Sequence, residues 1–241
     1  MLVVLFRYMP TAAYSRRIDE WRNVHWRTQS VAAASNEDLM TLNPWLPLDV
    51  IRRFGNAVDA AIEPKPGDCV PVGTVVLSIV NQRMASLREL SLRRVAHLQC
   101  FMRRVVTLCL GGFQDPRGGS CVSAATNLPH SHGGLHRSEV WNQFSWAKWP
   151  LLHAALARRQ TRFALFVDAD VLILSNPFDR MPPSLLGAHA PSFVHQEELP
   201  SCANPSCGGE PCRINTGMLL ASSAPLCREV LRQLHPSASS G

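Results

Sequence analysis

The sequence predicts an α/β protein with a mostly parallel sheet flanked by helices, and three observations support this. Hydrophobic residues make up 46% of the 241 residues, which is enough for a sizeable core. Two β-branched apolar runs, 74–80 and 104–110, are separated by a stretch with helical spacing. A third apolar run, 161–167, follows another helical stretch. Strands that alternate with helices are typical of parallel sheets, because parallel neighbours need a crossover connection.

The chain divides at about residue 70 in this interpretation. Residues 1–70 show no continuous periodic pattern, and four prolines interrupt their second half. We therefore expect a lead-in of uncertain structure at 1–70, and one α/β domain at 71–241.

The first half of the predicted domain is a strand–helix–strand unit. Thr74–Val80 has the composition of a strand that is buried on both faces. Met84–Cys100 has helical spacing, and Arg104–Leu110 is a second buried strand followed by two glycines. The stretch Asp115–His136 is rich in Gly, Ser, Asn and Pro, so we expect a long loop there.

The second half supplies another helix and two more strands. Ser145–Arg159 is predicted to be a helix capped by Ser145, with Pro150 tolerated only near its start. Thr161–Val167 is the third buried strand. Ile214–Ala221 is a fourth, followed by a helix over 224–234.

Two carboxylates follow the third strand, in the segment FVDADVLILSNP. Asp168 and Asp170 lie beyond its carboxyl end, where open α/β sheets bind ligands. In an extended chain these side chains point to the same side and repel each other. A divalent cation resolves this repulsion, and carboxylate oxygens suit Mn²⁺ or Mg²⁺. The alternative is a solvated turn that happens to carry two acids.

A phosphatase of the haloacid-dehalogenase type also carries D-x-D after a hydrophobic strand, with the first Asp as nucleophile. In that class the motif opens the domain, and a Lys and further acids follow it. Here the motif lies in the last third of the chain, and no Lys follows Asp170. The context therefore argues against a phosphatase.

With these elements in place, the chain resembles the nucleotide-diphospho-sugar transferase family of plants, algae and protists, which are glycosyltransferases of the GT-A fold. It is more distantly similar to glycogenin-like enzymes. Four segments carry the resemblance in order: TVVLSIVN, FSWAKWPLLHAAL, FALFVDADVLILSNPF and CRINTGMLLASS. The resemblance implies transfer of a sugar from a nucleoside diphosphate sugar to a hydroxyl acceptor, with retention of configuration and in the Golgi or secretory lumen.

The same resemblance implies a role for each matching residue. Asp170 would be the direct ligand of Mn²⁺ (or Mg²⁺), and Asp168 would share metal and donor-ribose contacts. Lys148 would bind the diphosphate from the first turn of its helix, where free N–H groups also favour anions. A solvated surface lysine is the alternative interpretation of Lys148.

Three further residues would complete the nucleotide-sugar site. Asn215 and Gly217 match an N-[ST]-G element that lines the donor sugar, although so short a motif also fits an ordinary strand start. Asn81, at the end of the first strand, is placed to meet the nucleotide base.

The chain also departs from the family pattern. Relatives often draw another metal ligand, commonly His, from a later segment, and His235 is the only His after Gly217. The second half of the acceptor region has no counterpart, so no catalytic base or nucleophile is assigned. The alternative function is therefore a catalytically inactive donor-binding or scaffold fragment of the same fold.

The charge pattern and the lengths of the apolar runs indicate whether nucleic acid or a membrane is a partner. The net charge is +6, but the basic residues are scattered and accompany no nucleic-acid motif, so we expect no nucleic-acid partner. No apolar run approaches the roughly 18 residues that span a membrane.

Eight cysteines are present, and Cys202, Cys207 and Cys212 form a row with four residues between neighbours. This spacing is unusual for structural zinc, so a loop disulfide in an oxidising compartment is the favoured interpretation.

Overall fold

A computed structural model gives the fold, and all the residues that it describes belong to the second of two compact units, 1–34 and 35–241. The described residues are 46–84, 86, 89, 98–111, 120–124, 147–171, 173–187, 190–191, 193–197 and 214–227.

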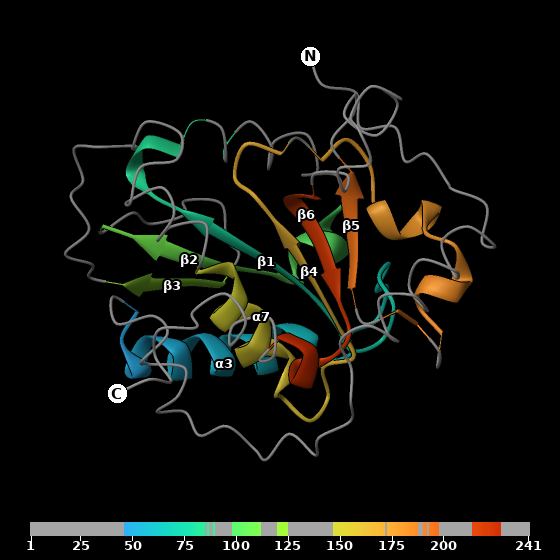
Figure 1. The fold of residues 1–241 in the computed structure, drawn as a ribbon, viewed down its shortest axis with the longest axis horizontal. Coiled ribbons are helices and arrows are strands. Elements are labelled where there is room, and N and C mark those ends of the chain that lie inside the picture. The colour runs from blue at the N-terminus through green and yellow to red at the C-terminus, as the bar shows by residue number, and fades with distance from the viewer. Residues whose placement is uncertain are drawn as a thin grey trace, which may run out of the picture. The chain divides into compact units, whose positions relative to one another are not determined.

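Within the described residues, six strands form one sheet in the order β3-β2-β1-β4-β6-β5 (Figure 1). The strands are β1 Thr74–Val80, β2 Val105–Leu110, β3 Ser120–Ala124, β4 Phe163–Val167, β5 Phe193–Glu197 and β6 Ile214–Ala221. The first four are parallel, whereas β6 is antiparallel to both of its neighbours, β4 and β5. The predicted α/β class with a mostly parallel sheet is confirmed.

All four predicted strands are present, but two more were missed. β3 lies inside the stretch 115–136 that was predicted to be a loop, so that prediction is wrong for residues 120–124. Among the described strands, β3 pairs only with β2 and β5 only with β6, at the two edges of the sheet. Edge strands are short and half polar, so they lack the continuous apolar run by which the central strands were recognised.

The described helices are α3 Leu48–Ile62, α5 Gln99–Met102 and α7 Lys148–Leu156, with 3₁₀ turns η1 Gln82–Met84, η2 Pro177–Arg180 and η3 Pro183–Leu185. α7 begins three residues later than predicted, and its N-cap is Ala147 instead of Ser145. Pro150 consequently lies in the first turn, where its missing N–H leaves no intrahelical bond unmade. Most of the predicted helix 84–100 lies outside the described residues, and so does all but 224–227 of the last one.

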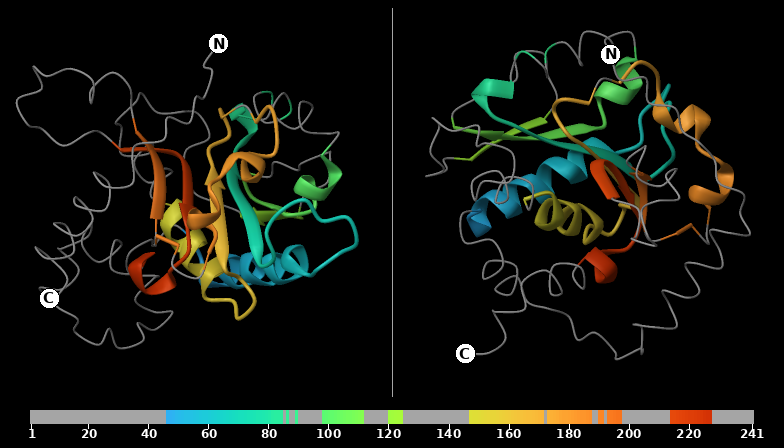
Figure 2. Two further views of the ribbon diagram at one scale, coloured as in Figure 1. Left: turned by 90° about the vertical axis from the view of Figure 1, so that its right-hand side faces the viewer. Right: turned by 45° about the horizontal axis from the view of Figure 1, so that its top comes forward.

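Both faces of the sheet are covered. α3 and α7 lie side by side on one face, as the views in Figures 1 and 2 show. Their apolar side chains pack against alternate strand residues such as Val75, Val106 and Phe166. On the other face, Phe101, Ile173 and Phe178 pack against the intervening strand residues. The segment that follows β4 therefore turns back across the sheet.

α3 belongs with this core, although the sequence analysis assigned its residues to the lead-in 1–70. Phe54 and Val58 are fully buried, and Arg158 beyond α7 forms an ion pair with Asp59. The domain boundary predicted near residue 70 thus excluded a helix that packs against the sheet.

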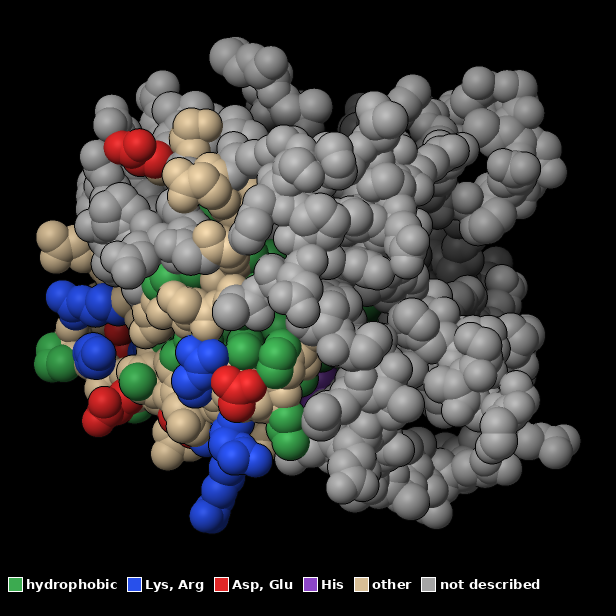
Figure 3. Space-filling view, turned by 90° about the vertical axis from the view of Figure 1, so that its left-hand side faces the viewer, with side chains coloured by type: hydrophobic (Ala, Val, Ile, Leu, Met, Phe, Trp, Pro, Cys, Tyr) green, Lys and Arg blue, Asp and Glu red, His purple; other side chains and the backbone are tan. Residues whose placement is uncertain are grey.

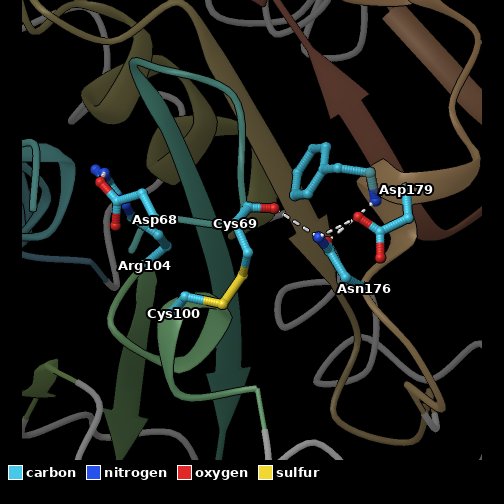
Figure 4. The surroundings of a disulfide bond; sticks show 7 residues. Asp68, Cys69, Cys100, Arg104, Asn176 and Asp179 are labelled. Atoms are coloured by element: carbon cyan, nitrogen blue, oxygen red, sulfur yellow. Dashed lines mark hydrogen bonds and ion pairs between the residues drawn. A yellow bond between two sulfur atoms is a disulfide. The ribbon is translucent and has the colours of Figure 1, made fainter. Parts of the chain in front are cut away.

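Two disulfides link described residues, Cys69–Cys100 and Cys109–Cys121, and the described thiol of Cys227 is free and buried. Cys69–Cys100 ties the loop before β1 to α5 (Figure 4). The row formed by Cys202, Cys207 and Cys212 lies outside the described residues.

The described surface carries no single-sign patch in the view of Figure 3, where basic and acidic side chains are interspersed. This fits the scattered charge seen in the sequence. No helix in the described part of the chain is long and apolar enough to cross a membrane.

Candidate functional site

The predicted site residues gather at one end of the sheet, which we call the carboxyl end because the parallel strands β1 to β4 finish there. Asp168 directly follows β4, and Asn81 directly follows the neighbouring strand β1. β6 runs the opposite way, so its first residues lie at the same end. The amide of Asp168 donates to the carbonyl of Gly217 (2.8 Å), which joins the D-x-D segment to the start of β6.

The D-x-D segment is a turn and not the extended chain that the sequence analysis assumed. The amide of Val171 donates to the carbonyl of Asp168 (3.1 Å), which closes a four-residue turn after β4. Ala169 is buried in a small cluster with Val80 and Cys109, whereas Asp170 is exposed. The small middle residue is therefore what packs, and this leaves an acid on each side of it nearer to solvent.

Lys148, the first residue of α7, points its ammonium into the protein towards Asp168. Lys148 Nζ lies 3.5 Å from Asp168 Oδ1, and the two side chains are 4% and 35% exposed. The same ammonium lies 5.1 Å from the centre of the Phe166 ring, within the range of a cation–π contact. Lys148 is thus not the solvated surface lysine of the alternative interpretation.

Burial and charge act in opposite directions on this pair. Burial lowers the pKa of Lys148, while the charges of Asp168 and Asp170 oppose that change. Burial likewise raises the pKa of Asp168, and the ammonium of Lys148 opposes it. Each group therefore depends on the other to remain charged in a poorly solvated position.

Asn81 has a local partner. Its side-chain oxygen accepts a hydrogen bond from the amide of Met84 (3.1 Å), which closes the η1 turn after β1. This bond fixes the orientation of the Asn81 side chain at the carboxyl end of β1. The predicted contact with a nucleotide base stays a prediction.

The start of β6 is described only through its backbone. Asn215 pairs with Gln196 of β5, two residues before the Gly217 carbonyl that meets Asp168. The Asn215 side chain and His235 lie outside the described part of the chain. The topology nevertheless brings Asn215 to the same end of the sheet as Asp170, as the sequence analysis required.

The donor set bears on the metal prediction. Among the described residues, no group of three or more His, Cys, Asp and Glu side chains could hold an ion. Mn²⁺ and Mg²⁺ are commonly held by one or two carboxylates together with substrate phosphates and water. Asp168 and Asp170 fit an ion that is shared with a bound diphosphate, and they do not form a complete protein-only site.

Sequence reasoning missed one residue that anchors the chain beyond the D-x-D turn. Asn176 is buried, caps η2 through the amide of Phe178 (3.2 Å), and donates to the carbonyl of Cys69 (2.6 Å) and to Asp179 (2.8 Å) (Figure 4). These bonds anchor the segment that returns from Asp170 across the sheet. The signal in the sequence was the Asn-Pro pair, which is typical of a capped turn.

No protein-family model matches this chain, and no curated protein matches it significantly. The fold and the residues described above are therefore the basis for any functional proposal.

Proposed function

We propose that this chain is a metal-dependent glycosyltransferase of the nucleotide-diphospho-sugar transferase type, with the GT-A variant of the α/β fold. It would move a sugar from a nucleoside diphosphate sugar to a hydroxyl acceptor. The observation that carries the proposal is the pairing of a buried ammonium, Lys148, with the first acid of a D-x-D turn at the carboxyl end of a central parallel strand. Cations and acids at that end of a sheet suit a diphosphate and its metal ion.

The chemical task of such a site is to stabilise a leaving diphosphate as negative charge builds on it. A bound Mn²⁺ or Mg²⁺ would supply positive charge next to the leaving group. The exposed carboxylate of Asp170 would hold that ion, and Asp168 forms an ion pair with Lys148. The carbonyl of Gly217 accepts the amide of Asp168, and without a side chain this residue would allow a sugar to approach the backbone closely. Asn215, two residues away, would offer its amide to sugar hydroxyls. Asn81 would meet the nucleotide base from the end of β1.

The two disulfides support a location in the secretory lumen, such as the Golgi. Cys69–Cys100 and Cys109–Cys121 both join well-packed elements of the domain. Structural disulfides persist in oxidising compartments and are rare in the cytosol.

A thermal-shift screen tests the proposal. Nucleoside diphosphates and their sugars are added with and without Mn²⁺ to the wild-type protein and to Asp170→Ala. We expect stabilisation that needs both nucleotide and metal, and that disappears in Asp170→Ala while the unliganded protein melts unchanged. Metal-dependent nucleotide binding that persists in Asp170→Ala contradicts the site assignment.

A second assay separates a transferase from the inactive donor-binding alternative. A transferase of this kind should also hydrolyse its donor slowly, because water can replace the acceptor. Release of free sugar from one donor supports transfer activity. Tight binding of donors without hydrolysis or transfer supports a donor-binding scaffold.

A further inference from the structure

The ammonium of Lys148 is already paired before any ligand arrives. It is almost completely buried, lies 3.5 Å from Asp168 and faces the Phe166 ring at 5.1 Å. A buried ammonium needs a nearby anion to offset its lost hydration. Asp168 therefore neutralises Lys148 in the absence of a ligand, in addition to any role as a metal ligand.

Counting charges shows what this pairing does to the site. Lys148, Asp168 and Asp170 together carry one positive and two negative charges, so the site has a net charge of −1. Two carboxylates without the lysine would carry −2. A divalent cation is therefore attracted by a single net charge, and it lies beside an ammonium that repels it.

A diphosphate reverses this balance. It brings at least two negative charges, which attract the ammonium and the metal ion together. The metal and the diphosphate should then bind with positive coupling, and each strengthens the other by the same factor. The protein's own carboxylates are too few to replace the diphosphate, since the described residues contain no third acidic or imidazole ligand near them.

We propose that Lys148 is a built-in counter-ion that makes metal binding at Asp168 and Asp170 conditional on a bound diphosphate. This inference rests on the proposed function for the identity of the diphosphate ligand. Its effect on the metal alone does not depend on that function. An ion would not be held by the empty site, and the site would assemble only with its donor.

The test measures Mn²⁺ affinity without any nucleotide, by calorimetry or from the electron paramagnetic resonance of free Mn²⁺. Lys148→Met keeps the length and apolar stem of the side chain but removes its charge. We expect this variant to bind lone Mn²⁺ at least about ten-fold more tightly than the wild type, because the competing charge is gone. Damage to the fold would weaken binding, so a gain is not a trivial result.

The chain offers matched controls. Lys65, the only other lysine, is exposed, so Lys65→Met should leave Mn²⁺ affinity unchanged. Lys148→Arg keeps the charge and should show no gain in affinity for lone Mn²⁺. If Lys148→Met does not fold, Lys148→Gln is measured in its place, since its amide can still donate to Asp168. If neither folds, the wild type in millimolar Mn²⁺ without nucleotide is tested for a bound ion at Asp168, and we expect none.

A second arm repeats the titration with saturating UDP or GDP. In the wild type the nucleotide should tighten Mn²⁺ binding strongly, and in Lys148→Met that tightening should shrink. Equal affinity of wild type and Lys148→Met for lone Mn²⁺, or an ion held at Asp168 by the empty wild-type site, overturns the counter-ion role. Lys148→Met could bind lone Mn²⁺ more tightly while UDP and GDP change Mn²⁺ affinity in neither protein. That result supports the counter-ion role and counts against the proposed function.

Discussion

Two buried cations, Arg104 and Lys148, are each paired with an aspartate, and they lie at opposite ends of the parallel strands. Arg104 directly precedes β2 and is 2% exposed; it forms an ion pair with Asp68 and donates to the carbonyl of Ala61 (3.0 Å). Lys148 is the first residue of α7 and pairs with Asp168, beyond the end of β4. The Arg104–Asp68 pair has equal numbers of positive and negative charges. The Lys148–Asp168 pair has a second acid, Asp170, beside it.

The difference follows from the chemistry of the two cations. The guanidinium of Arg104 is a planar fork that serves two acceptors on separate elements, the end of α3 and the loop before β1. Asp68 in turn accepts the amide of Lys65 (2.9 Å). The ammonium of Lys148 is a point charge with one carboxylate beside it and a second, exposed one nearby. The Arg104–Asp68 pair balances its charges and stabilises the fold, while the acids beside Lys148 leave one negative charge that a ligand can use.

The largest loss of stability should come from removing the disulfides. Cys69–Cys100 lies near the Arg104 pair, whereas Cys109 lies near the end of β2 and the D-x-D turn. Removing Cys69–Cys100, which closes a separation of 31 residues, should cost about 4 kcal/mol of unfolding free energy, against about 3 kcal/mol for Cys109–Cys121 with 12. Cys109 packs with Ala169 of the D-x-D turn. Only the Cys109→Ala/Cys121→Ala variant should therefore also weaken metal-dependent nucleotide binding.

Urea denaturation and nucleotide titration of the two double-alanine variants check this. If Cys69→Ala/Cys100→Ala impairs nucleotide binding as strongly as the other variant does, the two ends are not functionally distinct.

Arg104→Met should cost about 3 kcal/mol, because it leaves the Ala61 carbonyl without its donor and Asp68 without its ion-pair partner. Lys148→Met should cost less than about 1 kcal/mol, since Asp168 still reaches water and a buried charge is removed. Unfolding free energies measured under one condition give both values. Asp49→Asn, which breaks an exposed pair with Arg53, is the control and should change stability by about 0.5 kcal/mol or less. A reversed order of the two losses would contradict the assignment of a structural and a ligand-binding pair.

The two acids of the D-x-D turn should also behave differently. Asp168→Asn removes the partner of a buried ammonium and should cost about 2 kcal/mol of stability. Asp170→Asn changes an exposed side chain, so its effect on stability should stay within about 0.5 kcal/mol. Both should lose metal-dependent nucleotide binding. Thermal melts and titrations of both variants separate the two effects, and equal destabilisation by both would show that Lys148 does not depend on Asp168.

Sequence reasoning found the central part of this molecule because burial there leaves a simple pattern. The strands β1, β2 and β4 are continuous β-branched or aromatic runs, and the predicted end of the third run put Asp168 directly after β4, where the structure has it. That a ligand binds there stays a prediction. It failed for α3, where Val50, Phe54, Val58 and Ile62 recur every four residues between prolines that were taken as breakers.

Other features could not have been predicted in this way. Eight cysteines allow too many connectivities for Cys69–Cys100 or Cys109–Cys121 to be chosen from spacing alone. The depth of Lys148 is also a tertiary property. Its place at a helix start was visible, but the Phe166 ring beneath it and the Asp168 carboxylate beside it depend on how α7 packs on β4.

The smallest expected effect concerns acid stability and tests whether the Arg104 pair is the acid-sensitive element of the fold. Burial tends to raise the pKa of Asp68, but the amide of Lys65 and the guanidinium of Arg104 outweigh it, so the pKa lies below its ordinary value of 3.8. A carboxyl with a lowered pKa contributes stability above pH 3.8, and that contribution is lost as the pH falls through the folded-state value. The excess unfolding free energy of the wild type over Asp68→Asn should therefore be constant near neutral pH and shrink on further acidification.

Asp59 also has a lowered pKa, through its hydrogen bond to Arg158, but both side chains are more than one-third exposed. Asp59→Asn should consequently change the free energy of unfolding at acidic pH by less than about 0.5 kcal/mol. Urea denaturation from about pH 7 to about pH 3 measures all three proteins. An advantage over Asp68→Asn that persists undiminished at the lowest pH would mean that the Asp68 carboxylate does not stabilise Arg104 through its charge, and the contrast with Lys148 would then lose its electrostatic basis.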